Sequence, residues 1–334
     1  MNSYRNLTLN MSKIITQFPA IIFFMFLISC EQDADIIDPD EVGIWKYFNT
    51  SNGLTNNDIR AIKQDASGTV WIGTYGGGVC TWDNGNWSSL QQNDGLLDNR
   101  IYSIEEDVFG DIWIGTAGGL SIFSDGSLTN YPTISGGYYL PISLYSDSRG
   151  WMWIGTTSGI YIFDYSDVYP ISFQNEDLNT IWAITEDNKG QVWFSTQGGA
   201  LFFNEDDGFD LLTVNEGLYS NNVRYIFQDS WGKLWFAHLE TERITRWDGT
   251  VFEYINLLNG YSFANVLSIV EDLNRNIWFT SKNSGVTCFD GVIPRTIGIY
   301  SGLKDTDIRC SAVENTGNLW FGSKNQGIQV YIPE

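Results

Sequence analysis

One stretch, TVWIGTYGGGVCTWDNG at Thr69–Gly85, recurs in varied form down to the end of the chain. Every copy contains a tryptophan that follows an apolar residue and precedes another. These anchors are Trp71, Trp113, Trp153, Trp193, Trp235, Trp278 and Trp320, spaced by 42, 40, 40, 42, 43 and 42 residues. A repeat of this length is typical of arrays whose units bury their apolar faces only against one another.

Each unit reads as four short strands, here named a, b, c and d. In the first unit IRAIKQD alternates from Ile59, TVWIGT is apolar throughout, VCTWD alternates, and WSSL follows a turn. The interruptions between them, DASG, YGGG and NGN, are turn sequences. No segment between the strands has the length or period of a helix, so the pattern predicts an all-β repeat.

The b strands determine how the units pack. Sequences such as VWIGT and LWFGS are apolar on both faces, so neighbours must cover them on both sides. A small residue two places after the tryptophan, such as Gly73, permits close approach of the next unit. A ring of radially packed four-stranded antiparallel sheets meets both conditions, and we therefore predict a single seven-bladed β-propeller.

The two ends of the array predict how the ring closes. The last unit ends in its c strand, GIQVYIPE, whereas Ile44 to Phe48 precedes the first unit and reads as a d strand without a blade. We predict that Ile44 to Phe48 completes the blade of Trp320, because joining the ends removes two exposed sheet edges.

The links between strands a and b read D-x-x-G in five units. An Asp that bonds its own backbone and a Gly at positive φ are turn chemistry, so we assign these residues to the scaffold and expect no calcium site. The sixth unit has Arg275 where Gly is expected, and the seventh has Glu314 in place of Asp.

The first thirty residues have the features of a secretory signal: Lys13, an apolar run over residues 21–28, and the small Ser29. Leu27-Ile28-Ser29-Cys30 resembles the lipobox of bacterial lipoproteins, which implies lipidation of Cys30. A plain signal peptide or membrane anchor is the alternative, and either Met1 or Met11 could be the start. We expect a lipoprotein signal peptide at 1–30, an acidic tether at 31–41, and the propeller at 42–334.

Composition narrows the partners. The net charge of −22 argues against nucleic acid and against anionic membrane surfaces, leaving a lipid anchor as the membrane contact. Three cysteines besides Cys30 allow at most one disulfide, and core packing is the better interpretation. No His/Asp/Glu cluster has metal-ligand spacing, so we expect no metal and no cofactor. We expect a monomer.

The stretch GLTNNDIRAIKQDASGTVWIGTYGGGVCTWDNG resembles the two-component regulator propeller repeat. The resemblance extends over nearly all of 44–332. It implies kinship with the periplasmic sensor halves of Bacteroidetes hybrid histidine kinases, which respond to polysaccharide breakdown products. Those kinases carry further modules after the propellers; this chain stops where the ring is complete, so no kinase activity is expected.

Strand order places the d–a and b–c loops on one face, and these loops are the longer and more varied ones. Binding sites favour such loops on a rigid scaffold, and the second residue of strand a should lie beside them at the channel mouth. In the third unit this register is uncertain. The candidate ligand-binding residues are Arg60, Tyr75, Tyr102, Trp182, Arg224, His238, Lys282, Arg309 and Lys324.

Two departures from the repeat sharpen this list. His238 is the only histidine and replaces a Gly-rich loop; it is either a surface residue of a drifted loop or a polar contact or acid/base at the rim. Arg60, Arg224, Arg309, Lys282 and Lys324 come from adjoining units. They either attract an anionic ligand or pair with local acids such as Asp58 and Asp307.

Three functions follow from these residues. The first is a membrane-tethered, sensor-like binding module in the cell envelope, such as the outer membrane, that recognises a glycan, in particular an anionic oligosaccharide. The second is a lyase acting on a uronate polysaccharide, with His238 or a rim tyrosine as base. The third is a scaffold for another envelope protein. The lack of a second histidine favours a binder over an enzyme.

Overall fold

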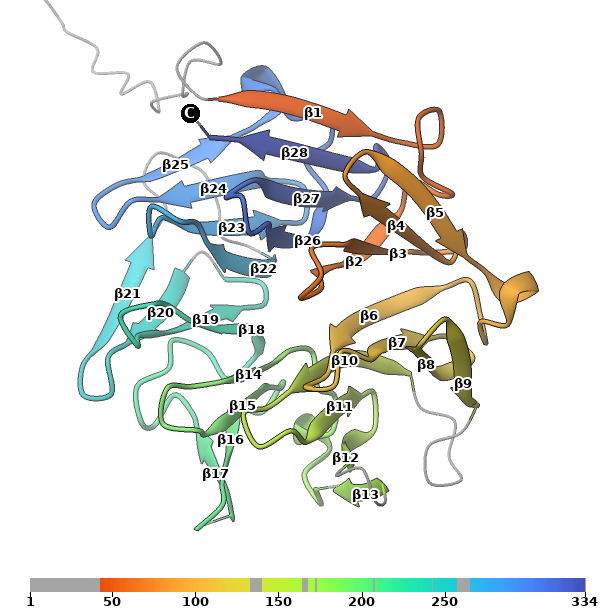
Figure 1. The fold of residues 1–334 in the computed structure, drawn as a ribbon. Coiled ribbons are helices and arrows are strands. Elements are labelled where there is room, and N and C mark those ends of the chain that lie inside the picture. Colours follow the sequence, from red (N-terminus) through yellow and green to blue (C-terminus); the bar gives the residue numbers. More distant parts are fainter. Residues whose placement is uncertain are drawn as a thin grey trace, which may run out of the picture. The chain divides into compact units, whose positions relative to one another are not determined.

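The computed structural model describes residues 43–132, 140–163, 168–171, 173–206, 208–241, 243–256 and 265–333. The predicted signal segment, Cys30 and the acidic tether lie outside the described residues. Seven four-stranded antiparallel sheets follow one another around a central axis (Figure 1). The predicted all-β, seven-bladed propeller is confirmed.

Each blade runs from an inner strand a to an outer strand d. The a strands are β2 (Ile59–Gln64), β6 (Ile101–Glu106), β10 (Pro141–Ser146), β14 (Ile184–Glu186), β18 (Val223–Gln228), β22 (Val266–Glu271) and β26 (Ile308–Val313). The b strands are β3 (Val70–Thr74), β7 (Ile112–Thr116), β11 (Met152–Thr156), β15 (Val192–Ser195), β19 (Leu234–His238), β23 (Ile277–Ser281) and β27 (Leu319–Ser323).

The outer half of each blade follows the same order. The c strands are β4 (Val79–Asp83), β8 (Gly119–Ser124), β12 (Gly159–Phe163), β16 (Ala200–Asn204), β20 (Arg243–Trp247), β24 (Gly285–Phe289) and β28 (Ile328–Ile332). The d strands are β5 (Asn86–Leu90), β9 (Ser127–Tyr131), β13 (Val168–Ile171), β17 (Gly208–Leu212), β21 (Phe252–Asn256), β25 (Pro294–Ile297) and β1 (Ile44–Phe48). Short 3-10 helices occupy three d–a loops: η2 (Gln92–Asp94), η3 (Glu176–Leu178) and η4 (Ile299–Ser301).

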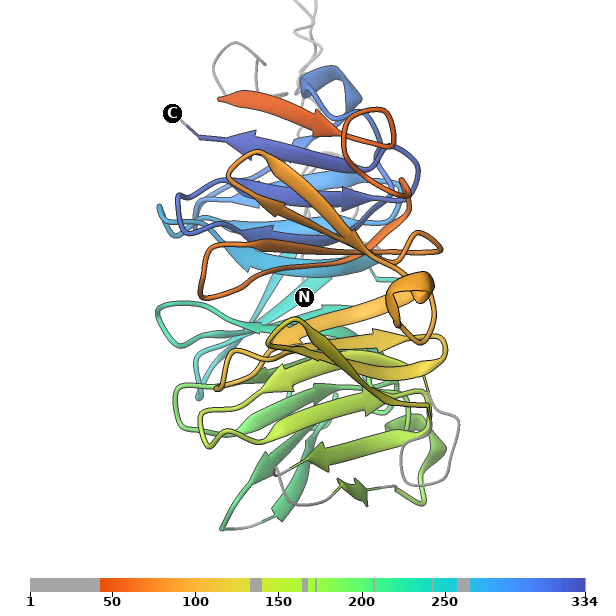
Figure 2. The same cartoon turned by 45° about the vertical axis from the view of Figure 1, so that its right-hand side comes forward.

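The ring closes as the sequence predicts. Strand β1 pairs antiparallel with β28, from Ile44 opposite Ile332 to Phe48 opposite Ile328. The two strands lie side by side in both views (Figures 1 and 2). The ring of Trp45 packs against Tyr331, with centroids 5.2 Å apart, so the closure is held by side chains as well as by the ladder.

The tryptophans of the b strands pack between blades. Each meets an aromatic residue at the end of strand c in the next blade. The pairs and their centroid distances are Trp71–Phe123 5.4 Å, Trp113–Phe163 5.2 Å, Trp153–Phe203 5.3 Å, Trp193–Trp247 5.9 Å, Trp235–Phe289 5.8 Å, Trp278–Tyr331 5.4 Å and Trp320–Trp82 5.2 Å. These offset and edge contacts join the seven sheets into one core.

The acidic residue of each a–b turn, Asp in six units and Glu314 in the seventh, has a second role that the sequence did not reveal. Its carboxylate accepts a hydrogen bond from the indole Nε1 of the tryptophan six residues later. The distances are Asp65–Trp71 2.7 Å, Asp107–Trp113 2.9 Å, Asp147–Trp153 2.7 Å, Asp187–Trp193 2.9 Å, Asp229–Trp235 2.8 Å, Asp272–Trp278 2.8 Å and Glu314–Trp320 3.3 Å. The turn and the inter-blade tryptophan are therefore one structural unit.

Candidate functional site

A bulge in strand a places one side chain per blade at the central channel. In six a strands the pairing with strand b shifts between the first and third residues, so the second residue is unpaired. A bulge of this kind re-aims a side chain. The residues concerned are Arg60, Tyr102, Ile142, Arg224, Leu267 and Arg309; Trp182, just before β14, takes the same place in the fourth blade.

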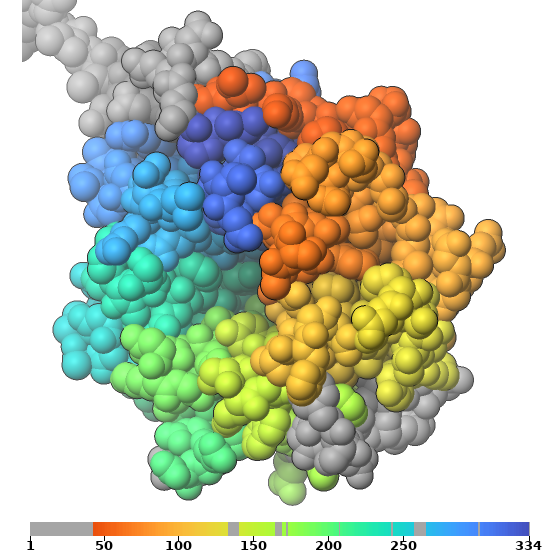
Figure 3. All heavy atoms as spheres, in the orientation of Figure 1, coloured from red at the N-terminus to blue at the C-terminus, as the bar shows by residue number. Residues whose placement is uncertain are grey.

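All seven of these residues line one central cavity of about 420 Å³. Figure 3 shows the hollow at the middle of the ring. The third unit, whose register the sequence left uncertain, contributes Ile142. Serine hydroxyls of the a strands bond to the next blade around the cavity: Ser103 Oγ donates to the carbonyl of Pro141, and Ser143 Oγ to that of Ile181.

Two of the three channel arginines are paired with an aspartate two residues earlier. Arg60 donates from Nε and Nη2 to Asp58, at 2.6 and 2.9 Å. Arg309 forms an ion pair with Asp307: its Nη2 donates to Oδ2 at 2.8 Å, and its Nε lies 2.5 Å from Oδ1. The sequence Asp-Ile-Arg produces both pairs, and each pair is close to neutral. For these two arginines, pairing with local acids is therefore what the structure shows.

Arg224 differs because Asn222 occupies the position of the aspartate. Within the described part of the chain, the Arg224 guanidinium forms no ion pair; it lies 4.4 Å from the ring of Trp182. Burial, and secondarily the charge of Arg309, lowers the pKa of Arg224 to about 10. At neutral pH the group is still protonated, so an uncompensated cation lies in the channel.

Two polar atoms near Arg224 also lack partners. Among the described residues, the indole Nε1 of Trp182 and the Oδ1 of Asn222 are buried and make no hydrogen bond. Such atoms are uncommon in folded proteins and cost about 1–3 kcal/mol each. Trp182 lines the channel with Arg224, whose guanidinium lies over the indole ring. This pair is suited to an acceptor group that carries negative charge.

The outer residues of the predicted site lie around this centre. Tyr75 is 37% exposed; its ring lies 4.7 Å from the Arg60 guanidinium and meets the Tyr102 ring edge-on, with centroids 6.0 Å apart. Lys282 and Lys324 are exposed on their b–c loops and do not line the cavity. Of the five predicted cations, three therefore reach the channel and two remain at the rim.

His238 lies inside a blade. It ends strand β19 with none of its surface exposed, and its Nε2 lies 2.7 Å from the Thr245 hydroxyl. Burial lowers the pKa of His238 to about 4, so the imidazole is neutral at physiological pH. The structure gives His238 a place in the packing of the fifth blade and no contact with the channel cavity.

We expect this histidine to make the protein sensitive to mild acid. The pKa of this imidazole is near 6.5 in the unfolded chain and about 4 in the folded protein. Unfolding therefore takes up a proton at any pH between about 4 and 6.5. Stability is therefore retained above pH 6.5 and lost as the pH falls, by about 2 kcal/mol between pH 7 and 5. Urea unfolding of His238→Gln should show a pH dependence smaller by that amount. Equal slopes in both proteins would contradict the assignment.

The far part of the channel carries a charge pair that sequence reasoning missed. Lys63 donates to Glu105 of the next blade. Burial raises the pKa of Glu105, while Lys63 opposes that rise. Both residues are the fifth of their a strands, three places beyond Arg60 and Tyr102. Comparing equivalent positions of neighbouring units would have found this pair. The same comparison would have found that Asn222 stands where the first and seventh units have Asp58 and Asp307.

Neither a metal-binding cluster nor a membrane-spanning helix is found among the described residues. Within the described ranges, no group of three or more His, Cys, Asp or Glu side chains is arranged to hold a metal ion. No helix among those residues is long and apolar enough to cross a membrane.

Solved structures with the same architecture include both sensors and lyases. The extracellular domain of BT3049, assigned to a hybrid two component system of B. thetaiotaomicron, has a TM-score of 0.76 at 23% identity, covering 87% of this chain and 41% of that one. Streptogramin B lyase has a TM-score of 0.72 at 16% identity, covering 88% and 98%. Virginiamycin B lyase from Staphylococcus aureus has 0.71 at 15%, covering 86% and 99%. These likenesses establish the fold.

Sequence comparison identifies the repeat. Among curated proteins, none matches the sequence significantly. The family model described as two component regulator propeller matches residues 53–76, 95–118 and 175–198, each running from a d–a loop into the following b–c loop. The chain is thus a seven-bladed propeller in which three segments match the two-component regulator propeller repeat.

Proposed function

We propose that this chain is a sensor-like binding propeller of the cell envelope whose channel mouth, on the d–a/b–c face, binds an anionic oligosaccharide. The observation that carries the proposal is the uncompensated Arg224 beside Trp182. A lipid anchor at Cys30 and an extracytoplasmic location are part of this proposal.

The charge of Arg224 argues for an anionic group. Two neighbouring arginines of the same design have their own carboxylates, and only Arg224 has an asparagine in place of the acid. A guanidinium binds carboxylate or sulfate through two parallel hydrogen bonds. A ligand carboxylate would take the place that Asp58 and Asp307 take beside their arginines, and the Trp182 Nε1 could donate to the same ligand.

The aromatic residues argue for a sugar. Trp182, Tyr102 and Tyr75 surround the mouth with ring faces that can cover the C–H faces of a pyranose. A cavity of about 420 Å³ lies within the range of small-ligand sites. Uronic or sulfated sugars combine such a face with an anion. The likeness to an extracellular domain of a hybrid two component system agrees with a role in ligand sensing.

The lyase alternative draws support from the lyases that share the fold along nearly their full length. One of them was crystallised in a form made catalytically inactive by a histidine-to-alanine change. In this chain the single histidine is buried and neutral, so Tyr75 or Tyr102 would have to be the base. Release of unsaturated uronate from polygalacturonate, followed by ultraviolet absorbance, would favour the lyase over the binder; release abolished by Tyr75→Phe would identify the base.

Calorimetric titration tests the binding proposal. Trigalacturonate is the charged probe and maltotriose the neutral one. We expect the wild-type protein to bind trigalacturonate more tightly and Arg224→Gln to weaken that binding about 30-fold, the equivalent of about 2 kcal/mol, because a buried charge partner is removed.

Arg100→Gln is the matched control, since it removes one exposed arginine of the same face that pairs with Asp98. Its affinity should stay within about twofold of wild type. Wild-type affinity in Arg224→Gln, or no binding of trigalacturonate by the folded wild-type protein, would refute the proposal. Retention of a single envelope protein in place of glycans would favour the scaffold alternative.

A further inference from the structure

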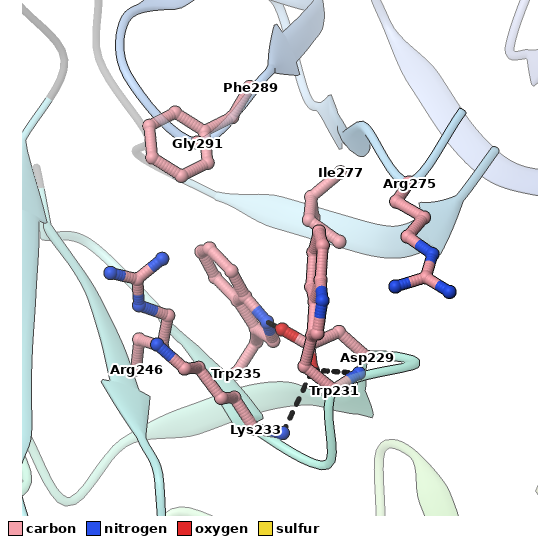
Figure 4. Close-up of a pocket in the computed structure, with 9 residues that line it drawn as sticks. All are labelled: Asp229, Trp231, Lys233, Trp235, Arg246, Arg275, Ile277, Phe289 and Gly291. Carbon is pink, nitrogen blue, oxygen red and sulfur yellow. Dashed lines mark hydrogen bonds between the residues drawn. The ribbon is translucent and has the colours of Figure 1, made fainter.

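A second pocket lies on the opposite face, between the a–b turns of the fifth and sixth blades. It has a volume of about 370 Å³, and its walls include Trp231, Trp235, Arg275 and Phe289. Figure 4 shows Trp231 and Arg275 on one side of this groove, with Phe289 and Arg246 on the other. The channel site has no residue in common with it.

The groove presents an exposed indole beside a guanidinium. Trp231 is 59% exposed, and the Arg275 guanidinium lies 5.2 Å from its ring. An exposed tryptophan of this kind gains nothing from the core, which the strand-b tryptophans already fill. A flat apolar ring next to a cation is the arrangement that stacks on a sugar and holds its carboxylate.

Charge in the groove is not balanced at Arg275. Arg246 pairs with Glu253, with Nε to Oε2 at 2.7 Å, and Lys233 lies near Asp248. The carboxylate of Asp229 is buried and occupied by the backbone N–H groups of Trp231 and Lys233 and by the Trp235 indole. Within the described residues, Arg275 has no acidic partner, so its charge is available to a ligand.

The backbone of Arg275 is in the left-handed region, where a side chain costs conformational free energy. Six of the seven a–b turns place Gly at this position, all at positive φ; the residues are Gly68, Gly110, Gly150, Gly190, Gly232 and Gly317. Arg275 adopts φ +67 in the seventh. A non-glycine residue in this region costs about 1 kcal/mol. Glycine would serve the turn better, so the turn alone does not explain an arginine here.

We propose that this groove is a second carbohydrate site that binds a single uronate residue, with the sugar stacked on Trp231 and its carboxylate held by Arg275. This inference rests on the proposed function for the class of ligand, but the groove and the channel site have no residue in common. A propeller with sites on both faces could hold two segments of one polysaccharide or bridge two chains.

Arg275→Gly tests the groove with little risk to the fold, because it restores the residue of the other six turns. The measurement is titration with trigalacturonate in the Arg224→Gln background, where the channel site is already weakened. We expect residual binding in that background and a further loss of about tenfold in Arg224→Gln/Arg275→Gly, with unchanged or raised thermal stability.

A matched pair separates this inference from the channel proposal. Trp231→Ala should reproduce the effect of Arg275→Gly, whereas Asn274→Ala, an exposed residue of the same turn, should not. Unchanged affinity in both Trp231→Ala and Arg275→Gly would overturn the groove site and leave the channel proposal standing. Loss on Arg275→Gly with no effect of Arg224→Gln would overturn the channel proposal alone.

Discussion

Trp153→Ala is expected to lower the free energy of unfolding by about 4 kcal/mol. The side chain is fully buried, packs against Phe194 and Phe203 with centroids 5.2 and 5.3 Å away, and donates to Asp147 at 2.7 Å. Truncation leaves a cavity between two blades and removes a donor from a buried carboxylate. The cavity and the lost hydrogen bond both arise at this inter-blade contact. The loss of stability should therefore exceed that caused by a cavity alone.

Two further variants separate these contributions by urea unfolding. Trp153→Phe keeps a ring but not the N–H, and should cost about 1 kcal/mol, because the buried Asp147 loses one donor but keeps those of Arg149 and Trp151. Trp231→Ala removes an exposed tryptophan and should cost less than about 1 kcal/mol. A loss in Trp153→Ala no larger than in Trp231→Ala would contradict the role assigned to the strand-b tryptophans.

The fold was predictable because its determinants are local and repeated. Apolar b strands, a turn carboxylate and the spacing of the tryptophans recur in every unit, and the unmatched strand Ile44–Phe48 showed where the ring closes. The hydrogen bond from Trp153 Nε1 to Asp147 was not predictable from the pattern alone, since both residues already had a sufficient role. It depends on the path of the a–b turn, which folds the carboxylate back over the indole.

The position of the candidate site could be predicted from the sequence, but the charge state of its arginine pairs was not predicted. Strand order placed the second residue of each a strand at the channel, yet it left open which arginines are paired. The geometry shows that a residue two places earlier decides it: Asp58 neutralises Arg60, and Asn222 leaves Arg224 without a partner. His238 looked like a rim residue because its loop departs from the repeat, but it belongs to strand β19 and is buried there.

Asn222→Asp is expected to abolish selective binding of anionic oligosaccharides at the channel mouth by installing the pair that the first and seventh blades contain. The new carboxylate would lie two residues before Arg224, as Asp58 does before Arg60, and would compete with the ligand for the guanidinium. Because the substitution also adds a buried negative charge, we expect at least about a 100-fold loss in affinity for trigalacturonate, about 3 kcal/mol. The fold should be at least as stable, since Arg224 gains a partner.

Asn57→Asp is the matched control. It adds the same charge to a d–a loop of the same face, and its Oδ1 can still accept the N–H of Thr50, as in the wild-type protein at 2.9 Å. Net charge therefore changes equally in the two variants, and long-range repulsion is screened over about 10 Å at moderate salt. Binding by Asn57→Asp should stay within about threefold of wild type.

The most direct measurement of the central claim is the ratio of the dissociation constants for maltotriose and trigalacturonate with and without Asn222→Asp, in proteins that all carry Arg275→Gly so that the groove does not contribute. If Arg224 binds anions because residue 222 is an asparagine, the protein with Asn222 should favour the charged sugar by at least about tenfold, and the Asn222→Asp protein should show a ratio near one. An undiminished preference in a folded Asn222→Asp protein would show that the anion is bound elsewhere and that the account of the channel is wrong.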